Sequence, residues 1–302
     1  MVTRTTAVAI LTAVSASLAA APADASQLIG RNAKQVRLVV ASSGVAYVSF
    51  RSGGKRVRLQ ASGAVNARTP SPTRPQLAFR LRYGARAAGR NVCRPYEGPE
   101  LPALVAACRA PDDSFWALQS WQRGLPNYGV RPNARQAAWE LRLSHWHGPL
   151  AEFTVWPDWL YGGRFQGLFG RLMYGGKPVY GFRATRSGVP LDGYGRNLYL
   201  DTYNSAYGRG WRRENSFLAH RGTGLFCYGF YPRRTPRRTA AVAGIGERYR
   251  LTVIGPGVTP DMRWEGEGLP TFDPRNPAHI LFDRSTNELR AALLAGDRAC
   301  RG

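Results

Sequence analysis

Two histidines separated by one residue, His145 and His147, close an apolar stretch that begins at Trp139. Residues two positions apart in a strand point to the same face, so both imidazoles would follow Leu141 and Leu143 on one side. Two adjacent imidazoles can hold Zn²⁺ or Cu²⁺ once a third ligand completes the set. Candidates for that third ligand are Glu152, Asp158 and His220. The alternative is that both histidines hydrogen-bond locally at the end of the strand.

Carboxylates follow the histidines. On the next expected strand, Glu152 and Asp158 share a face with Trp156. Six residues of strand at about 3.3 Å each place the two carboxylates roughly 20 Å apart, whereas glycosidase pairs need about 5–10 Å. They cannot be each other's catalytic partner. A pairing with carboxylates from other strands stays open, and the candidates are Asp192, Asp201 and Glu214.

A row of Tyr199, Asp201 and Tyr203 shares one face of the segment LYLDTY. Flat rings pack on the C–H faces of sugars and a carboxylate accepts bonds from their hydroxyls, so we expect an exposed sugar-binding row here. The rings that could extend it are Trp156, Trp159, Trp211 and Tyr207. The competing interpretation is an ordinary β-sheet core flanked by surface tyrosines.

Arginine dominates the charge. The chain has 302 residues and a net charge of +23, which favours anionic partners such as acidic wall polymers. Guanidinium groups match phosphate oxygens, and the expected anion-binding arginines are Arg233, Arg234, Arg237 and Arg238 in a Pro-flanked loop, with Arg212 and Arg213. The alternatives are a solvated loop and the codon bias of a GC-rich genome. Nucleic acid is not expected, because the chain carries an export signal.

That signal occupies residues 1–25. Arg4 supplies the positive start, an apolar run follows, and Ala23-Asp24-Ala25 fits a cleavage site. The apolar run is shorter than the roughly 18 residues expected of a membrane-spanning helix, and no second run of that kind occurs. We therefore expect a secreted or cell-wall-associated protein without a transmembrane segment in its mature chain.

Four cysteines fit an oxidising compartment and two disulfides. Sequence alone leaves three connectivities open, of which we favour Cys93–Cys108 and Cys227–Cys300. On the chain-entropy model these would stabilise the fold by roughly 3 and 4 kcal/mol. No zinc-type cysteine spacing occurs.

The remaining pattern is that of β-structure. Residues 36–60 predict a hairpin around Ser52-Gly53-Gly54, residues 76–83 and 114–122 predict strands, and the segment between Cys93 and Cys108 predicts one or two helical turns. Glycine turn signals recur through the central block every eight to twelve residues. A capping box from Ser285 to Glu288 predicts a short C-terminal helix that ends at Gly296.

We therefore expect an all-β, mainly antiparallel fold of the β-sandwich or jelly-roll kind, with an N-terminal hairpin and a short C-terminal helix. Residues 26–302 would form one domain with a weak internal boundary near 66–75. The segments WALQSWQR, WELRLSHW, YGGRFQGLFGR, LDGYGRNLYLDTYNSAYG and FCYGF resemble a group of secreted proteins of uncharacterised activity from high-GC Gram-positive bacteria. The resemblance implies export and a single folded unit, and it implies no activity.

Known catalytic motifs for zinc peptidases, serine hydrolases, phosphate loops and dinucleotide binding do not occur, and no cofactor is expected. The leading hypothesis is non-catalytic binding of an extracellular or cell-wall polymer, either carbohydrate or anionic glycopolymer, through aromatic and arginine surfaces. The alternative is a secreted hydrolase, possibly metal-dependent, that uses His145, His147 and nearby carboxylates.

Overall fold

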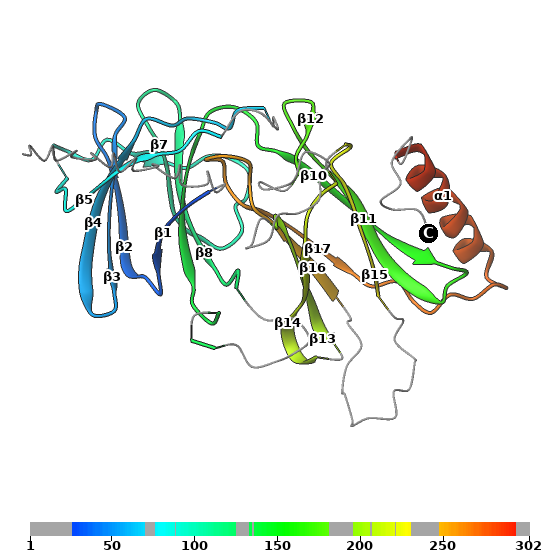
Figure 1. Ribbon diagram of the computed structural model, residues 1–302. Coiled ribbons are helices and arrows are strands. Elements are labelled where there is room, and N and C mark those ends of the chain that lie inside the picture. Colours follow the sequence, from blue (N-terminus) through cyan, green and yellow to red (C-terminus); the bar gives the residue numbers. More distant parts are fainter. Residues whose placement is uncertain are drawn as a thin grey trace, which may run out of the picture.

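The computed structural model describes residues 26–69, 76–87, 89–124, 133–134, 136–180, 196–205, 207–220, 222–230 and 248–293. Within these ranges the chain forms 17 strands and one helix (Figure 1). The strands make four sheets, and every strand pair in them is antiparallel. The expected all-β, antiparallel class with a C-terminal helix is confirmed.

The first half of the chain supplies two sheets. Sheet I has the order β1-β9-β8-β7-β6, and sheet II has the order β2-β3-β4-β5. The strands of sheet I are β1 (Gln27–Arg31), β9 (Glu140–Trp146), β8 (Phe115–Trp121), β7 (Leu104–Arg109) and β6 (Arg94–Pro95). Those of sheet II are β2 (Lys34–Val40), β3 (Ala46–Ser52), β4 (Lys55–Ser62) and β5 (Arg80–Tyr83).

One apolar core joins these two sheets. It takes Val48, Phe50 and Leu59 from sheet II and Trp116 and Leu141 from sheet I, all buried. The β-branched and aromatic residues that alternate along 36–60 point into this core, which is why the predicted hairpin forms and is confirmed by β2, β3 and β4.

The second half supplies sheets III and IV. Sheet III runs β10-β11-β12 with β15 also paired to β11, and sheet IV has the order β14-β13-β16-β17. The strands of sheet III are β10 (Glu152–Leu160), β11 (Phe165–Tyr174), β12 (Lys177–Pro178) and β15 (Leu225–Phe230). Those of sheet IV are β14 (Gly208–Phe217), β13 (Leu198–Ser205), β16 (Arg248–Val253) and β17 (Met262–Glu267).

A second apolar core joins sheets III and IV. Leu168 and Phe226 enter it from sheet III, and Leu200, Tyr249 and Leu251 enter it from sheet IV. Because successive side chains of a strand alternate between faces, the other face of sheet IV carries the polar members of the same strands. That polar face lies toward the first half of the molecule.

The two halves meet through the loop between β16 and β17. Val258 of this loop is part of the first core, and its carbonyl accepts a hydrogen bond from the His145 amide at 2.8 Å. Trp121 at the end of β8 packs edge-on against Tyr199 of β13, with 5.4 Å between ring centroids. Sheet I therefore covers part of the polar face of sheet IV.

Helix α1 (Pro277–Leu293) lies beside β10 at the far end of the molecule (Figure 1). Asn276 caps the helix, because its Oδ1 accepts a hydrogen bond from the Ala278 amide. Pro277 occupies the first turn, where the backbone N–H that proline lacks would have no partner within the helix. The predicted start at Ser285 is wrong: Ser285 lies inside the helix and donates to the Phe282 carbonyl. Residues beyond 293 lie outside the described part of the chain.

The segment between Cys93 and Cys108 is a strand, not the predicted helical turns. Residues 104–109 form β7 and pair with β8, and the Cys93–Cys108 disulfide, with 5.4 Å between Cα atoms, ties β7 to the preceding segment. This predicted bridge is confirmed. The other, Cys227–Cys300, involves a residue outside the described ranges and stays a prediction. Within those ranges, no helix combines the length and apolarity needed to cross a membrane.

Candidate functional site

The polar face of sheet IV gathers the strongest candidate group. Alternation places its members opposite the second core, and strand register aligns them: Asp201 pairs with Arg213 and Arg250, and Tyr203 pairs with Trp211 and Arg248. We call this surface the arginine face. It consists of Tyr199, Asp201, Tyr203, Trp211, Arg213, Arg248, Arg250, Arg263, Glu265 and Glu267.

The inner end of the arginine face is closed by sheet I. Asp201 is 2% exposed and accepts bonds from Arg213 Nε at 2.5 Å and Arg250 Nη2 at 2.9 Å. Arg213 is equally buried and also donates to the carbonyls of Gln122 and Arg123, which follow β8. A buried carboxylate held by two guanidinium groups is a structural ion-pair cluster that joins the two halves.

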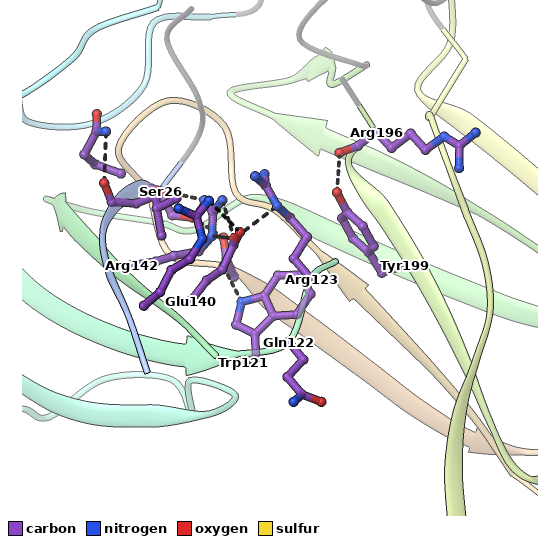
Figure 2. Close-up of polar contacts among 12 residues, drawn as sticks. Ser26, Trp121, Gln122, Arg123, Glu140, Arg142, Arg196 and Tyr199 are labelled. Carbon is purple, nitrogen blue, oxygen red and sulfur yellow. Dashed lines mark hydrogen bonds and ion pairs between the residues drawn. The ribbon is translucent and has the colours of Figure 1, made fainter. Parts of the chain in front are cut away.

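Tyr199 is part of the same closed end. Its ring is 4% exposed, packs against Trp121 and lies under the Arg213 guanidinium at 5.0 Å. Its hydroxyl donates to the Arg196 carbonyl at 3.1 Å, a contact visible in Figure 2. Burial raises the pKa of this hydroxyl, and the nearby arginines partly offset that rise. The expectation that Tyr199 and Asp201 form an exposed sugar-binding row is therefore wrong.

The outer end of the arginine face is open. Trp211 is half-buried, with the Arg250 guanidinium over its ring at 4.4 Å and that of Arg248 at 5.9 Å. Tyr203, also half-buried, meets Trp211 edge-on at 5.3 Å. The Arg248 side chain is 51% exposed and pairs with Glu265 at 3.4 Å. An aromatic ring flanked by guanidinium groups is a known recognition element for anions and for ring-bearing ligands.

Cations outnumber anions on this face. Arg213, Arg248, Arg250 and Arg263 share this face with the carboxylates of Asp201, Glu265 and Glu267. Burial lowers the pKa of Arg263, and the neighbouring Arg250 charge lowers it further. Its Nε has no hydrogen-bond partner among the described residues. The face as a whole therefore carries four guanidinium groups against three carboxylates.

The other predicted tryptophans lie elsewhere. Trp156 is half-buried on β10 and stacks on Phe169 at 5.4 Å. Trp159 is 3% exposed beneath α1, where its ring contacts Phe272 and Phe282 and its Nε1 donates to the Pro270 carbonyl. They do not extend the Tyr203–Trp211 pair, and the expectation that Trp159 is a surface ring is wrong.

The histidines do not form the expected pair. His145 is 5% exposed, its Nδ1 bonds the Ala64 carbonyl at 2.6 Å and its Nε2 bonds Ser114 Oγ at 2.8 Å. Burial lowers its pKa to about 4, against weaker opposing effects of the Ala64 bond and Asp112. His147 is exposed beyond the end of β9.

Both ring nitrogens of His145 are thus used within the protein, so a metal ligand role would require breaking one of these bonds. Within the described ranges, no group of three or more His, Cys, Asp or Glu side chains could hold a metal ion. The local hydrogen-bonding alternative describes His145.

The carboxylates are dispersed as well. Glu152 is exposed, and Asp158 is 1% exposed and tied to α1 by Arg290 Nη1 at 2.6 Å and Thr286 Oγ1 at 3.0 Å. Glu214 is the extra residue of a β-bulge in β14. Burial raises its pKa to about 7, and the neighbouring Thr202 hydroxyl partly offsets this rise. Asp192 lies outside the described residues, and His220 is exposed.

The predicted basic loop also lies outside the described part of the chain, including Arg233, Arg234, Arg237 and Arg238. Of its two expected neighbours, Arg212 is exposed, whereas Arg213 is buried on Asp201 and is not free for an external anion.

Sequence reasoning missed Arg248, Arg250 and Arg263. The signal was present, because RYRLTV and MRWEGE alternate charged and apolar residues with the period of a half-buried strand. The geometry supplies a half-buried tryptophan, a tyrosine, the exposed Arg248 guanidinium and the partly exposed guanidinium groups of Arg250 and Arg263. These groups can bind an anion, and the described residues bring no acid and base together here. No family model, curated protein or solved structure matches this chain.

Proposed function

We propose that this protein is a non-catalytic binder of an anionic extracellular or cell-wall polymer, and that the outer end of the arginine face makes the contact. The observation that carries the proposal is the Trp211 ring, half-buried between Tyr203 and the guanidinium groups of Arg248 and Arg250. The ring offers a flat apolar surface, and the guanidinium groups supply paired donors for carboxylate or phosphate oxygens.

Charge supports an anionic ligand over a neutral sugar. The chain carries a net charge of +23, and arginine supplies nearly all of its cations. A field of that sign raises the local concentration of a polyanion and speeds its association. A polymer with repeating anionic groups would gain from this field along its length, whereas a neutral glycan would gain nothing.

Binding is also favoured over the alternative secreted hydrolase. That hypothesis needs His145, His147 and carboxylates to converge, but His145 is sealed on Ser114 and Ala64 while Asp158 is bonded to α1. A catalytic acid and base must reach the same reacting atom. Among the described residues, the groups named for the hydrolase lie on separate elements with separate partners.

The fold suits a secreted scaffold. We propose that sheets I and II form one β-sandwich and sheets III and IV another, because a single apolar core joins each pair. The Cys93–Cys108 bridge agrees with an oxidising location outside the cytoplasm. The predicted export signal at residues 1–25 belongs to the same proposal.

The test is retention on defined polymers. Residues 26–302 are incubated with immobilised polygalacturonate, immobilised polyphosphate and a neutral glucan. We expect retention on one or both polyanions, little on the glucan, and release as sodium chloride rises from 0.05 to 0.5 M, because salt screens exposed charges.

Two variants locate the contact. Trp211→Ala and Arg248→Ala should each weaken retention by about tenfold, the equivalent of about 1.4 kcal/mol. The matched control is Arg56→Ala, which removes an exposed arginine from sheet II, away from the arginine face. Equal weakening by all three variants would mean that overall charge, not this site, holds the polymer. No retention on either polyanion would overturn the proposal.

A further inference from the structure

Ser26, the first described residue, is fixed in the interior of the molecule. It is 0% exposed, its Oγ donates to Asp261 Oδ1 at 2.5 Å, and its carbonyl accepts a bond from Arg142 Nη1 at 2.5 Å. Arg142 is itself fully buried (Figure 2). A serine at the edge of a strand would ordinarily be solvated, so this burial calls for a physical reason.

The partner of Ser26 is a carboxylate with an unusual set of neighbours. Asp261 is completely buried, and its hydrogen bonds within the described residues come from the Ser26 hydroxyl, Trp121 Nε1 at 2.7 Å and the Gly255 amide at 3.2 Å. All three donors are neutral. Burial raises the pKa of Asp261, and the charge of Arg142, which does not bond to it in the described structure, lowers it in part.

Glu140 provides the contrast. It is linked to Asp261 through Arg142 and Ser26, and it takes direct ion pairs from Arg142 and Arg123, both at 3.1 Å (Figure 2). A third ion pair comes from Arg31 at 3.6 Å. The arginines are therefore bonded to the less buried of the two carboxylates. The more buried carboxylate, Asp261, has no ion pair within the described residues.

The backbone nitrogen of Ser26 lies near this carboxylate. Covalent geometry keeps a serine nitrogen within about 4 Å of its own Oγ. Added to the 2.5 Å between Ser26 Oγ and Asp261 Oδ1, this puts the nitrogen at most about 6.5 Å from that carboxylate oxygen, at the outer limit of the distance over which a cation stabilises the charged form.

The backbone of Ser26 gives a second, independent observation. Its φ is +30°, which is in the left-handed region that costs a residue with a side chain about 1 kcal/mol or more. This cost exists only while a peptide bond joins Ala25 to Ser26, because φ is defined by that bond. A chain that begins at Ser26 has no φ at this residue and is free of this cost, and the hydrogens of its ammonium group can rotate about the N–Cα bond.

We propose that the chain is cleaved between Ala25 and Ser26, and that the freed α-ammonium group of Ser26 forms a buried ion pair with Asp261 that locks the two halves together. Cleavage is hydrolysis by a processing peptidase. One water adds across the peptide bond, Ala25 leaves with the carboxylate, and the Ser26 nitrogen keeps its electron pair and becomes an ammonium group. Because Ser26 is sealed in the folded protein, cleavage comes before the halves close.

The position of the new terminus would let it join the two halves of the fold. Asp261 belongs to the loop between β16 and β17, whereas Ser26 precedes β1 of sheet I. Their pairing joins the first residue of the processed chain to the second half of the fold. Processing would then be coupled to the closure that forms the inner end of the arginine face. This inference does not depend on which polymer the outer end binds.

The first measurement is the mass of the protein after export from a bacterial host that expresses the full chain. We expect a mature chain that begins at Ser26. A mature chain that begins at any other residue, or no cleavage, would overturn the proposal.

The second measurement compares the thermal midpoints of two chains. One begins at Ser26, released from an upstream tag without leftover residues, and the other keeps Ala25 in front of it. We expect the Ser26 form to melt at least about 3 °C higher at pH 6, by the usual relation between stability and melting temperature for a domain of this size. Equal midpoints would overturn the ion pair.

The pH dependence of that difference identifies the ammonium group. Pairing raises the folded pKa of the amine above its ordinary value of roughly 8, so its contribution is fully present below that value and is lost as pH rises through the folded pKa. Asp261→Asn should abolish the difference between the two chains, and the surface control Asp113→Asn should keep it. If Asp261→Asn does not fold, acetylation of the Ser26 amine replaces it, and an unchanged midpoint after acetylation would count against the proposal.

Discussion

The two ends of the arginine face are built from the same strands and the same residue types, but the side chains of the inner end are buried and those of the outer end are partly exposed. At the inner end, Tyr199 and Asp201 are buried beneath the end of β8 and the residues that follow it, and Arg213 forms an ion pair with Asp201. At the outer end, Tyr203 and Trp211 are half-buried, and the Arg248 side chain is exposed and pairs with Glu265. An aromatic-arginine pattern therefore serves as a structural joint in one place and as a candidate binding surface a few residues away.

The difference teaches that alternation determines the face of a side chain and not its depth. Tyr199, Asp201 and Tyr203 do share one face, as the period-two pattern predicts. Whether that face meets water depends on a segment about 80 residues earlier, where Trp121 and the carbonyls of Gln122 and Arg123 cover the first two residues. Mutations at the two ends should therefore have unlike consequences.

The largest expected effect is at Asp201. Asp201→Ala leaves Arg213 buried without its carboxylate, and removal of one partner of a buried pair costs about 3–5 kcal/mol. We expect that loss in the free energy of unfolding measured with urea. Tyr203→Ala, on the same face at the open end, should cost about 1 kcal/mol. Similar losses for the two variants would contradict the division into a sealed and an open end.

A second effect concerns Glu214, a buried carboxyl group with no ion pair to an arginine among the described residues. Its folded pKa of about 7 lies above the ordinary value of 4.5, so the folded protein holds a proton that the unfolded chain releases. Stability should then fall as pH rises from about 4.5 through 7, by on the order of 3 kcal/mol. Glu214→Gln should remove this fall.

The measurement for Glu214 is urea unfolding at pH 5 and pH 8. The quantity to compare is the decrease in the free energy of unfolding from pH 5 to pH 8, measured once for the wild type and once for Glu214→Gln. Glu152→Gln, which changes an exposed carboxyl group on β10, is the matched control and should leave the loss unchanged. A loss of equal size in Glu214→Gln would show that another group titrates.

His145 should act with the opposite sign. Its folded pKa of about 4 lies below the ordinary value of 6.5. Between these two pH values the imidazole is protonated in the unfolded chain and neutral in the folded protein. The stabilising contribution is complete above pH 6.5 and is lost as pH falls toward 4, by about 2–3 kcal/mol. His145→Gln should weaken this acid-induced loss, and His147→Gln, at an exposed position, should not.

Much of the fold follows from local pattern. The hairpin of 36–60 is predictable because β-branched runs flank a Gly-Gly turn, and the Cys93–Cys108 bridge because the two cysteines close a short loop in an oxidised chain. The strand at 104–109 was missed because LVAAC has ordinary helical propensity, and pairing with β8 overrides it. The capping box at Ser285 predicts the wrong helix start, because the helix begins at the second N-terminal signal, Asn276-Pro277, which lies earlier in the chain.

The candidate site follows from the sequence only in part. The shared face of Tyr199, Asp201 and Tyr203 was predictable, and so was the involvement of Trp211. Their depth was not, because the cover over the inner end comes from sheet I and depends on how the halves meet. The same holds for Ser26: the residues next to it do not predict its buried hydrogen bond to Asp261, which is 235 positions away.

The smallest effect on stability should come from Arg248, and it completes the contrast with Asp201. Its side chain is 51% exposed, pairs with the partly exposed Glu265 at 3.4 Å and lies 5.9 Å from the Trp211 ring. Exposed pairs contribute little because water and salt already solvate both charges, so Arg248→Ala should change the free energy of unfolding by less than about 0.5 kcal/mol. The same variant should still weaken polyanion retention, which separates a binding residue from a structural one. A loss above about 1 kcal/mol in urea unfolding would mean that the outer end is packed like the inner end, and the open half of the comparison would then be wrong.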